Sequence, residues 1–514
     1  MGIGYIRSGL EVLSQIHGEK CWPLVSKVSP CEEACPIHMD IPSYVIALAQ
    51  GQVKEAIDVI RETNPFPSIC GRVCHHPCEE ACNRALIDRP VAIEWIKRFI
   101  GEYQLKNNGM PEPVKRTREE RVAVIGSGPA GLTAAHDLVK KGYGVSVYEA
   151  LPKAGGMLAA GIPEFILPQK IVQAEVDYIK ALGVDIKTNI RIGKDLTLDE
   201  IWDQGFKAVL VATGAWKSAS LNVPGADFKR VIQALPLLRD VKLGQKISLK
   251  GTVVIIGGGN VAVDAARTAL RLGAEEVVLT CLESKSKMPA FPWEIDMARR
   301  EGVKIKTSLA PQRFTANAVG KVNQVVFKKV ASVRRDREGR MTWTLKKGSD
   351  NEVIMSADTV IIAIGQVADP SFIGKDLEID PETSATNIQG LFAAGDLVKA
   401  PGTVVESIAA GHEVAASIDK YLDGEELKPA PSEEDPEVFT IKEEMVPAFL
   451  LKKDRWDMPS LSPKDSIRSL SESSLGYTEW QVREEAKRCL NCRMCGNCIF
   501  ERGQLCFEAS TRLL

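Results

Sequence analysis

The chain has 514 residues, of which 45% are hydrophobic and 26% are charged, and its formal net charge is −2. A single hydrophobic core does not grow to this length, so we expect several domains. The near-neutral charge argues against nucleic-acid binding, no apolar run is long enough to span a membrane, and the N-terminus lacks a secretory apolar core. We therefore expect a cytoplasmic protein that binds no nucleic acid and does not insert into a membrane.

Residues 1–115 are predicted to form a helical iron–sulfur domain. Apolar residues recur at helical spacing over 41–48 and 53–60. Cysteines are clustered in this region, which in a cytosolic chain indicates metal binding rather than disulfides. The candidate ligands are Cys31, Cys35, Cys70, Cys74, Cys78 and Cys82. Four thiolates hold an iron–sulfur cluster. Zinc is the alternative, but zinc would not explain why the cysteines accompany the nucleotide-binding patterns that follow.

Residues 116–245 are predicted to form the first part of an FAD-binding domain. An apolar strand over 121–125 leads into a glycine-rich fingerprint, and Glu149 ends the next predicted strand, 23 positions after Gly126. Such a turn brings a pyrophosphate to a helix N-terminus, and an acid at this distance accepts hydrogen bonds from a ribose. The fingerprint residues expected to bind the cofactor are Gly126, Gly128, Pro129, Ala130 and Gly131.

Residues 246–362 repeat this pattern and are predicted to bind a nicotinamide nucleotide. The second fingerprint follows the apolar run 252–256, and its expected binding residues are Gly257, Gly259, Asn260 and Val261. Glu283 ends the next expected strand, where an acid suits the free 2′-hydroxyl of NADH and repels a 2′-phosphate. This favours NAD(H) over NADP(H). Lys285 and Lys287 follow directly, so NADPH stays open.

Residues 363–425 are predicted to complete the FAD-binding domain. Thr213-Gly214 ends a strand before the second fingerprint, and Gly395-Asp396 ends a strand after it. With these segments the chain resembles the two-dinucleotide flavoproteins, which implies that Asp396 contacts FAD. Gly156, Met157 and Gly365 complete the expected cofactor-binding residues. No cysteine pair follows Glu149, so we expect no thiol–disulfide activity.

The C-terminal region is predicted to comprise a connector over 426–485 and an iron–sulfur tail over 486–514. The tail cysteines are Cys489, Cys492, Cys495, Cys498 and Cys506. Their spacing is close to half of a bacterial ferredoxin, where three cysteines two residues apart and one distant cysteine hold a cubane. We expect one 4Fe-4S cluster here, with a 2Fe-2S cluster and zinc as alternatives. The expected fold is therefore α/β: two Rossmann-like dinucleotide-binding domains, preceded by a helical iron–sulfur domain and followed by a small ferredoxin-like cysteine tail.

The segments at 31–36, 64–67 and 70–74 resemble the N-terminal domain of the glutamate synthase small subunit and of dihydropyrimidine dehydrogenase. The resemblance extends over about 25–425, and the chain is also similar to the large subunit of electron-bifurcating NADH-dependent ferredoxin:NADP oxidoreductase. In these relatives the domain carries two 4Fe-4S clusters. Here only Cys21 lies upstream, and Lys97 occupies a position where some relatives have a Glu or Gln ligand. We therefore expect one or two N-terminal clusters, a second one needing a non-cysteine ligand such as Glu94, His75 or His76.

Together these parts predict an NAD(P)H-dependent FAD and iron–sulfur oxidoreductase. Ring stacking suffices for hydride transfer, so we assign no catalytic side chain. The resemblance implies an electron-transfer subunit working with a partner protein: ferredoxin, a glutamate synthase large subunit or an electron-bifurcating complex. The alternative is a self-contained NAD(P)H-dependent reductase of a small molecule, which would need a further substrate domain.

Overall fold

The computed structural model describes residues 28–107, 109–335, 341–348, 351–374, 377–399, 402–427, 438 and 452–492. The chain divides into two compact units. The first unit comprises residues 1–110, 428–459 and 476–514, and the second comprises residues 111–427 and 460–475.

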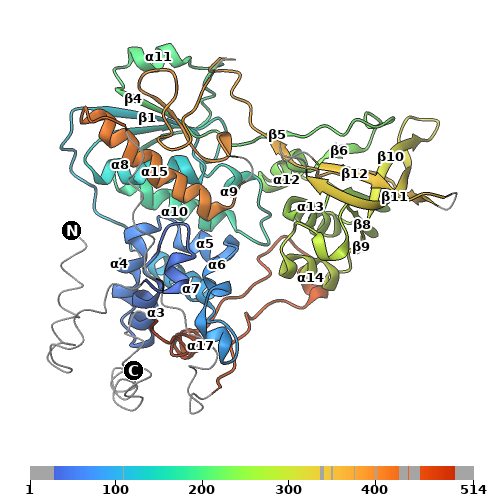
Figure 1. Cartoon of the computed structure of the whole chain (residues 1–514), viewed down its shortest axis with the longest axis horizontal. Helices are drawn as coiled ribbons and strands as arrows, with labels where there is room; N and C mark the ends of the chain where they lie inside the picture. The colour runs from blue at the N-terminus through green and yellow to red at the C-terminus, as the bar shows by residue number, and fades with distance from the viewer. Residues whose placement is uncertain are drawn as a thin grey trace. The chain divides into compact units, whose positions relative to one another are not determined.

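The first unit is helical in its described part, as the apolar spacing predicts (Figure 1). Its helices are α2 (Pro30–Glu33), α3 (Ile41–Ala49), α4 (Val53–Thr63), α5 (Pro67–Val73), α6 (Pro77–Glu80), η2 (Asn83–Leu86), α7 (Ile93–Lys106) and α17 (Glu479–Ala486). Helix α17 begins with a capping box between Thr478 and Gln481, which satisfies the free N–H groups of its first turn. This C-terminal helix packs on α3 and α7, so the two ends of the chain form one unit.

The second unit contains two parallel sheets of five strands each. The first sheet has the order β16 (Leu391–Ala393), β4 (Ala208–Val211), β1 (Arg121–Ile125), β2 (Gly144–Tyr148) and β3 (Asp185–Lys187). Strand β1 is central and pairs Ile125 with Tyr148 on one side and with Val211 on the other. This register brings the carboxyl ends of β1, β2 and β4 to one edge, where ligands bind in open α/β sheets.

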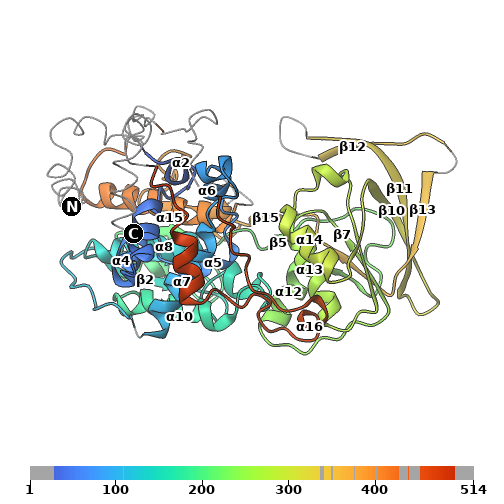
Figure 2. The ribbon, with the colours of Figure 1, turned by 90° about the horizontal axis from the view of Figure 1, so that it is seen from below.

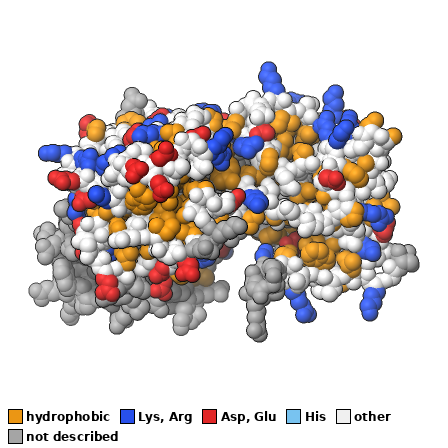
Figure 3. All heavy atoms as spheres, turned by 90° about the horizontal axis from the view of Figure 1, so that it is seen from above, with side chains coloured by type: hydrophobic (Ala, Val, Ile, Leu, Met, Phe, Trp, Pro, Cys, Tyr) orange, Lys and Arg blue, Asp and Glu red, His pale blue; other side chains and the backbone are white. Residues whose placement is uncertain are grey.

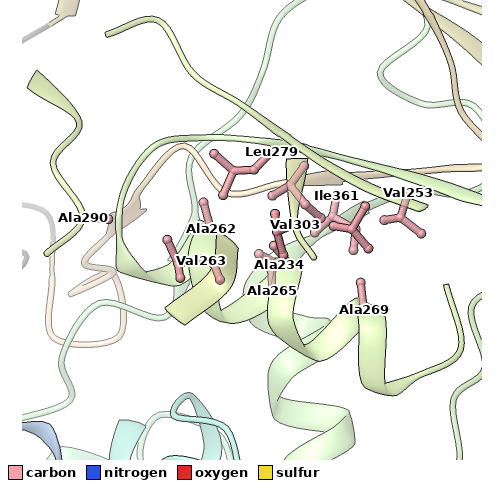
Figure 4. Packing of buried hydrophobic residues seen from close by; sticks show 14 of the residues in the cluster. Ala234, Val253, Ala262, Val263, Ala265, Ala269, Leu279, Ala290, Val303 and Ile361 are labelled. Carbon is pink, nitrogen blue, oxygen red and sulfur yellow. The ribbon is translucent and has the colours of Figure 1, made fainter. Parts of the chain in front are cut away.

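The second sheet repeats this arrangement around β7. Its order is β6 (Val231–Gln233), β14 (Thr359–Ile362), β7 (Thr252–Ile256), β8 (Glu276–Thr280) and β9 (Lys304–Lys306). The central strands are runs of Val and Ile because both faces of the sheet are buried, one against helices and the other against the antiparallel strands β10 and β11. Figure 4 shows residues of β7, β8 and β14 packed against α12 (Ala234–Lys242) and α13 (Asn260–Arg271). The expected pair of doubly wound sheets is thus confirmed.

An antiparallel sheet is inserted in the chain between β9 and β14 of the second Rossmann sheet (Figure 2). It consists of β10 (Leu309–Ala316), β11 (Val322–Arg335), β12 (Met341–Leu345) and β13 (Glu352–Ser356). A short pair, β5 (Lys217–Ser218) and β15 (Gln366–Val367), joins the two segments that cross between the Rossmann sheets.

The remaining helices of this unit are α8 (Pro129–Lys140), α9 (Met157–Ala160), α10 (Gln169–Ala181), α11 (Leu198–Asp203), η3 (Lys285–Lys287), α14 (Pro292–Arg300), η5 (Gly395–Leu397), α15 (Val404–Leu422) and α16 (Pro463–Ser466). Long helix α15 packs along α8 (Figure 1).

On the face in Figure 3, acidic and basic side chains are interspersed over the described surface. Among the described residues, no helix has the length and apolarity that crossing a membrane requires.

Candidate functional site: two dinucleotide cradles and two sets of cysteines

The first fingerprint forms the turn between β1 and α8. Gly126 has φ +104°, and its N–H donates to the Tyr148 carbonyl at 2.8 Å, so the turn needs a residue free to adopt the left-handed region. A Cβ at Gly128 would meet no atom within 4 Å, so space is open in front of the first turn of α8. Pro129 starts that helix, whose free N–H groups and dipole favour an anion. The cradle therefore fits the pyrophosphate of a dinucleotide.

Glu149 lies beside this turn, directly after β2. Its carboxylate accepts hydrogen bonds from the Ser127 N–H at 3.1 Å and the Ser127 hydroxyl at 2.5 Å. The Leu151 N–H donates to its other oxygen at 2.8 Å. These bonds fix the carboxylate at the carboxyl edge of the sheet, where the sequence predicts an acceptor for a ribose.

The later flavin segments come to the same edge. Thr213 and Gly214 follow β4, and Gly395 follows β16, which pairs with β4. A Cβ on Gly395 would lie 3.0 Å from the Ala130 Cβ, and a Cβ on Gly156 would lie 2.7 Å from the Gly128 Cα. Segments far apart in the chain therefore converge on the first fingerprint.

Asp396 is held by the loop that precedes α15. The Gly402 N–H donates to its Oδ1 at 2.9 Å. Burial raises the pKa of Asp396, and the neighbouring Glu406 carboxylate adds to the increase. A partly buried acid with one fixed oxygen can accept a hydrogen bond from a hydroxyl-bearing ligand through the other.

The second fingerprint has the same geometry between β7 and α13. A Cβ on Gly257 would lie 2.1 Å from the Ala363 carbonyl at the end of β14, whereas a Cβ on Gly259 would meet no atom within 4 Å. Asn260 begins the helix, and its side-chain oxygen accepts the Phe291 N–H at 2.9 Å. Val261 follows in the first helical turn. Gly365 lies just after β14 with a positive φ of +123°.

Strand β8 ends at Thr280, so Glu283 lies in the following loop rather than at the strand end. The Ser308 N–H donates to its carbonyl at 2.9 Å and fixes the backbone there. Its Oε2 lies 3.1 Å from where a Cβ on Gly258 would be, so the carboxylate faces the fingerprint turn. Lys285 and Lys287 are exposed.

Cys281 is the one cysteine in the sequence of the second unit. It is 3% exposed, and burial raises its pKa to about 12. A buried, protonated thiol without a cysteine neighbour has no means of thiol–disulfide exchange.

A first set of four cysteines in the helical unit comes from α5, from the residue after it, from α6 and from the segment after α2. Its members are buried, with 0–6% exposure: Cys35, Cys70, Cys74 and Cys78. Burial raises the pKa of the Cys70 thiol to about 12, and the Cys74 and Cys35 sulfurs add to the increase. A metal or cluster has to displace these protons.

Lys97 of α7 lies at this first set. It is 4% exposed, and although burial opposes its charge, the four cysteine sulfurs raise its pKa. A four-thiolate cluster carries negative charge, which a buried ammonium would balance. Tyr44 is fully buried, and burial raises its pKa; the sulfurs of Cys78, Cys35, Cys31 and Cys74 add to the increase. Its hydroxyl has no hydrogen-bond partner among the described residues. This donor is available to a cluster.

The suggested non-cysteine ligands have other contacts. The His76 Nδ1 lies 3.2 Å from a Glu94 carboxylate oxygen, and both side chains are largely buried. The Glu94 N–H donates to Glu79 at 2.9 Å. The first set already offers four thiols, so it does not require Glu94, His75 or His76.

A second set of cysteines lines one cavity in the same unit: Cys31, Cys82, Cys489 and Cys492. Burial raises the pKa of Cys31 to about 12, with the Cys82 and Cys492 sulfurs contributing. Cys495, Cys498 and Cys506 lie outside the described residues. In the described ranges, no three His, Cys, Asp or Glu side chains are arranged as ligands of a single metal ion.

A repeated sequence pattern accounts for the division of the cysteines into two sets, and cysteine spacing alone does not reveal it. The hexapeptide Pro-Cys-Glu-Glu-Ala-Cys occurs twice, at 30–35 and at 77–82. Both copies form a four-residue helix, α2 and α6, and the two helices pack together. Each copy contributes one cysteine to each set.

Comparison with known proteins agrees with both units. Residues 120–411 match the pyridine nucleotide-disulphide oxidoreductase family, and residues 14–109 match dihydropyrimidine dehydrogenase domain II, 4Fe-4S cluster. The NADP(+)-dependent formate dehydrogenase subunit beta of Moorella thermoacetica is 36% identical, covering 91% of this chain and 71% of that protein.

Two further relatives are similar. The NADPH-Fe(3+) oxidoreductase subunit beta of Geobacter sulfurreducens is 36% identical over 90% of this chain and 75% of its own length. The glutamate synthase [NADPH] small chain of Azospirillum brasilense is 34% identical over 76% of this chain and 86% of its own. The resemblance seen in the sequence is confirmed. The chain belongs to the pyridine nucleotide-disulphide oxidoreductase family, with an N-terminal iron–sulfur domain of the dihydropyrimidine dehydrogenase type.

Proposed function

We propose that this chain is the electron-transfer subunit of a multisubunit oxidoreductase, passing electrons between NAD(P)H, FAD and iron–sulfur clusters to or from a partner protein. One observation carries the proposal: a single chain combines two dinucleotide cradles with two sets of four cysteines. When bound, the flavin supplies the exchange between hydride transfer and single-electron transfer.

The residues of the first cradle are proposed to hold FAD. The open face at Gly128 and the start of α8 accommodate the pyrophosphate, and Glu149 accepts hydrogen bonds from the ribose. Asp396 accepts from a hydroxyl farther along the cofactor. These roles orient the flavin, and no side chain of the unit is required to move a proton.

The second cradle is proposed to bind NADH in preference to NADPH. The Glu283 carboxylate faces the turn at Gly258, where it accepts hydrogen bonds from a free ribose diol and repels a 2′-phosphate. The names of the three relatives above refer to NADP(+) or NADPH, and the exposed Lys285 and Lys287 are the residues that would bind that phosphate here.

The partner is proposed to be another subunit of a redox complex, because the relatives are named as subunits or a small chain. Ferredoxin, a glutamate synthase large subunit and an electron-bifurcating complex are the candidate acceptors or donors.

We propose a cytoplasmic location. The nine described cysteines form no disulfide, which suits a reducing compartment.

Anaerobic stopped-flow absorbance of the full-length protein tests this function. Mixing with NADH is expected to bleach the flavin band first and the broad cluster bands afterwards, and NADPH is expected to act more slowly. Faster reduction by NADPH would overturn the nucleotide preference. No flavin reduction by either nucleotide would overturn the electron-transfer function.

A further inference from the structure

We infer that Cys31, Cys82, Cys489 and Cys492 bind one 4Fe-4S cluster, so that the two ends of the chain each supply two ligands to the same site. This inference deepens the proposed function and rests on it only in requiring that the chain binds iron–sulfur clusters. It assigns the first two tail cysteines to the N-terminal domain rather than to a separate ferredoxin-like tail.

The four cysteines share one cavity whose other walls are mainly apolar. Ile41, Pro42 and Val45 of α3 form part of the lining, together with Val91 and Ile93. Cysteine is the common ligand of such clusters, and four thiolates complete one cubane. The chemistry and the number of donors therefore match a complete 4Fe-4S site.

The duplicated hexapeptide explains how neighbouring cysteines reach different sites. In both copies the final cysteine follows a short helix, and its N–H donates to the carbonyl of the first Glu: Cys35 to Glu32 at 3.1 Å and Cys82 to Glu79 at 3.2 Å. Because α2 packs on α6, the first cysteine of one copy joins the second cysteine of the other. Two-cluster bacterial ferredoxins distribute ligands in this way: the cysteine after a three-residue gap binds the other cluster.

Arg488 fixes the tail next to this cavity. Its side chain is fully buried and pairs with Glu485 at 2.5 Å and with Asp88 at 2.7 Å. It also donates to the backbone carbonyls of Pro90 and Lys453 at 3.2 and 3.0 Å. These contacts hold the residue that precedes Cys489 in one place.

Glu485 adds a second anchor from the last turn of α17. Its carboxylate is buried and accepts the Ala92 N–H at 2.9 Å and the Trp456 N–H at 3.0 Å. These bonds tie α17 to the start of α7 and to the segment that precedes α16. The tail cysteines therefore approach Cys31 and Cys82 on a fixed support.

The sulfurs of this set also have hydrogen-bond partners suited to thiolates. The Asn83 amide donates to the Cys492 Sγ at 3.4 Å, and the Ser29 hydroxyl lies 3.3 Å from the Cys31 Sγ. These donors would stabilise the negative charge of thiolates bound to a cluster.

Full-length protein purified anaerobically with its cofactors tests the inference. The variants are the double substitutions C31S/C82S and C489S/C492S, the quadruple substitution that combines them, and the control C495S/C498S in the same tail. The readouts are iron and acid-labile sulfide per chain, and the electron paramagnetic resonance spectrum after dithionite reduction. Each double variant is expected to lose about four irons and the same signal. The quadruple variant is expected to lose no more iron than either double variant. The control is expected to keep its full iron content and the signal.

Losses that add in the quadruple variant would show two separate clusters and overturn the inference. If C31S/C82S kept the signal and the control lost it, the signal would belong to a cluster held by the tail alone. That result would also overturn the inference. In either case the proposed function would stand, whereas wild-type protein without iron would contradict both.

If the double variants fold poorly, as judged by flavin content, the single variants C31S and C492S replace them. Each retains an oxygen that can bind iron, so each is expected to alter the g values of one and the same signal. Changes in two different signals would overturn the shared site.

Discussion

Replacing Glu283 by Ala is expected to reverse the nucleotide preference of the second cradle. The carboxylate faces the fingerprint turn, and the Ser308 N–H holds the backbone of residue 283, so the substitution removes the side chain without moving the loop. The two ribose hydroxyls would lose their acceptor, and a 2′-phosphate would no longer meet a negative charge.

The size of the effect follows from the burial of the carboxylate. A hydrogen bond to a charged group contributes about 1.5–3 kcal/mol, and Glu283 is only half-buried, so we take the lower value for each ribose hydroxyl. Two such bonds amount to about 3 kcal/mol, on the order of 100-fold in the Kd for NADH. Removing the repulsion is expected to lower the Kd for NADPH by roughly tenfold, because the interaction is partly screened by water.

The assay is anaerobic stopped-flow reduction of the flavin over a range of NADH and NADPH concentrations, which gives an apparent Kd for each. Lys285→Ala is the matched control: it lies two positions on, is exposed, and is expected to leave the apparent Kd for NADH unchanged. An equal loss of affinity for both nucleotides in Glu283→Ala, or no change in their ratio, would refute the assignment of Glu283 to the ribose.

Three further substitutions probe other parts of the chain. Glu301→Gln is expected to lower the free energy of unfolding of the second unit by about 3–5 kcal/mol, because it leaves buried Arg267 and Arg271 without their shared carboxylate; urea unfolding should show this, and unchanged stability would contradict it. Despite burial, hydrogen bonds from these arginines lower the pKa of Glu301 to about 2, so this stabilisation is complete above about pH 4.5 and is lost as the pH falls toward 2. Gly131→Ala would place a Cβ 2.1 Å from a backbone carbonyl of the same turn, so we expect destabilisation of about 1–3 kcal/mol and reduced FAD per chain, measured by absorbance; full FAD occupancy would argue against this packing. Lys97→Met is expected to lower the reduction potential of the cluster held by the first cysteine set, on the order of 60 mV if the lost charge contributes about 1.4 kcal/mol, and a redox titration that shows no shift would place the ammonium away from the cluster.

The two dinucleotide cradles could be predicted from sequence because their determinants are local. A buried strand, a glycine turn, a helix start and an acid lie within about 30 residues, and backbone sterics and burial fix how they fold. Glu149 follows its strand as expected, hydrogen-bonded to Ser127 of the fingerprint. Glu283 faces its turn from a loop instead, because β8 ends at Thr280.

The grouping of the cysteines was decided by tertiary structure. Cys31 and Cys35 are close in sequence, yet they join different sets, because Cys31 lies within α2, Cys35 follows that helix, and α2 packs against α6. Asn83 and Cys492 are 409 positions apart, and their hydrogen bond has no counterpart in local spacing. The sequence by itself determined the classes of cofactor, through a dinucleotide-binding unit and a 4Fe-4S domain, since donor type and local turns carry that information. Only the folded chain determined which thiols share a site, because that depends on the packing of segments from opposite ends, held by the buried charge of Arg488.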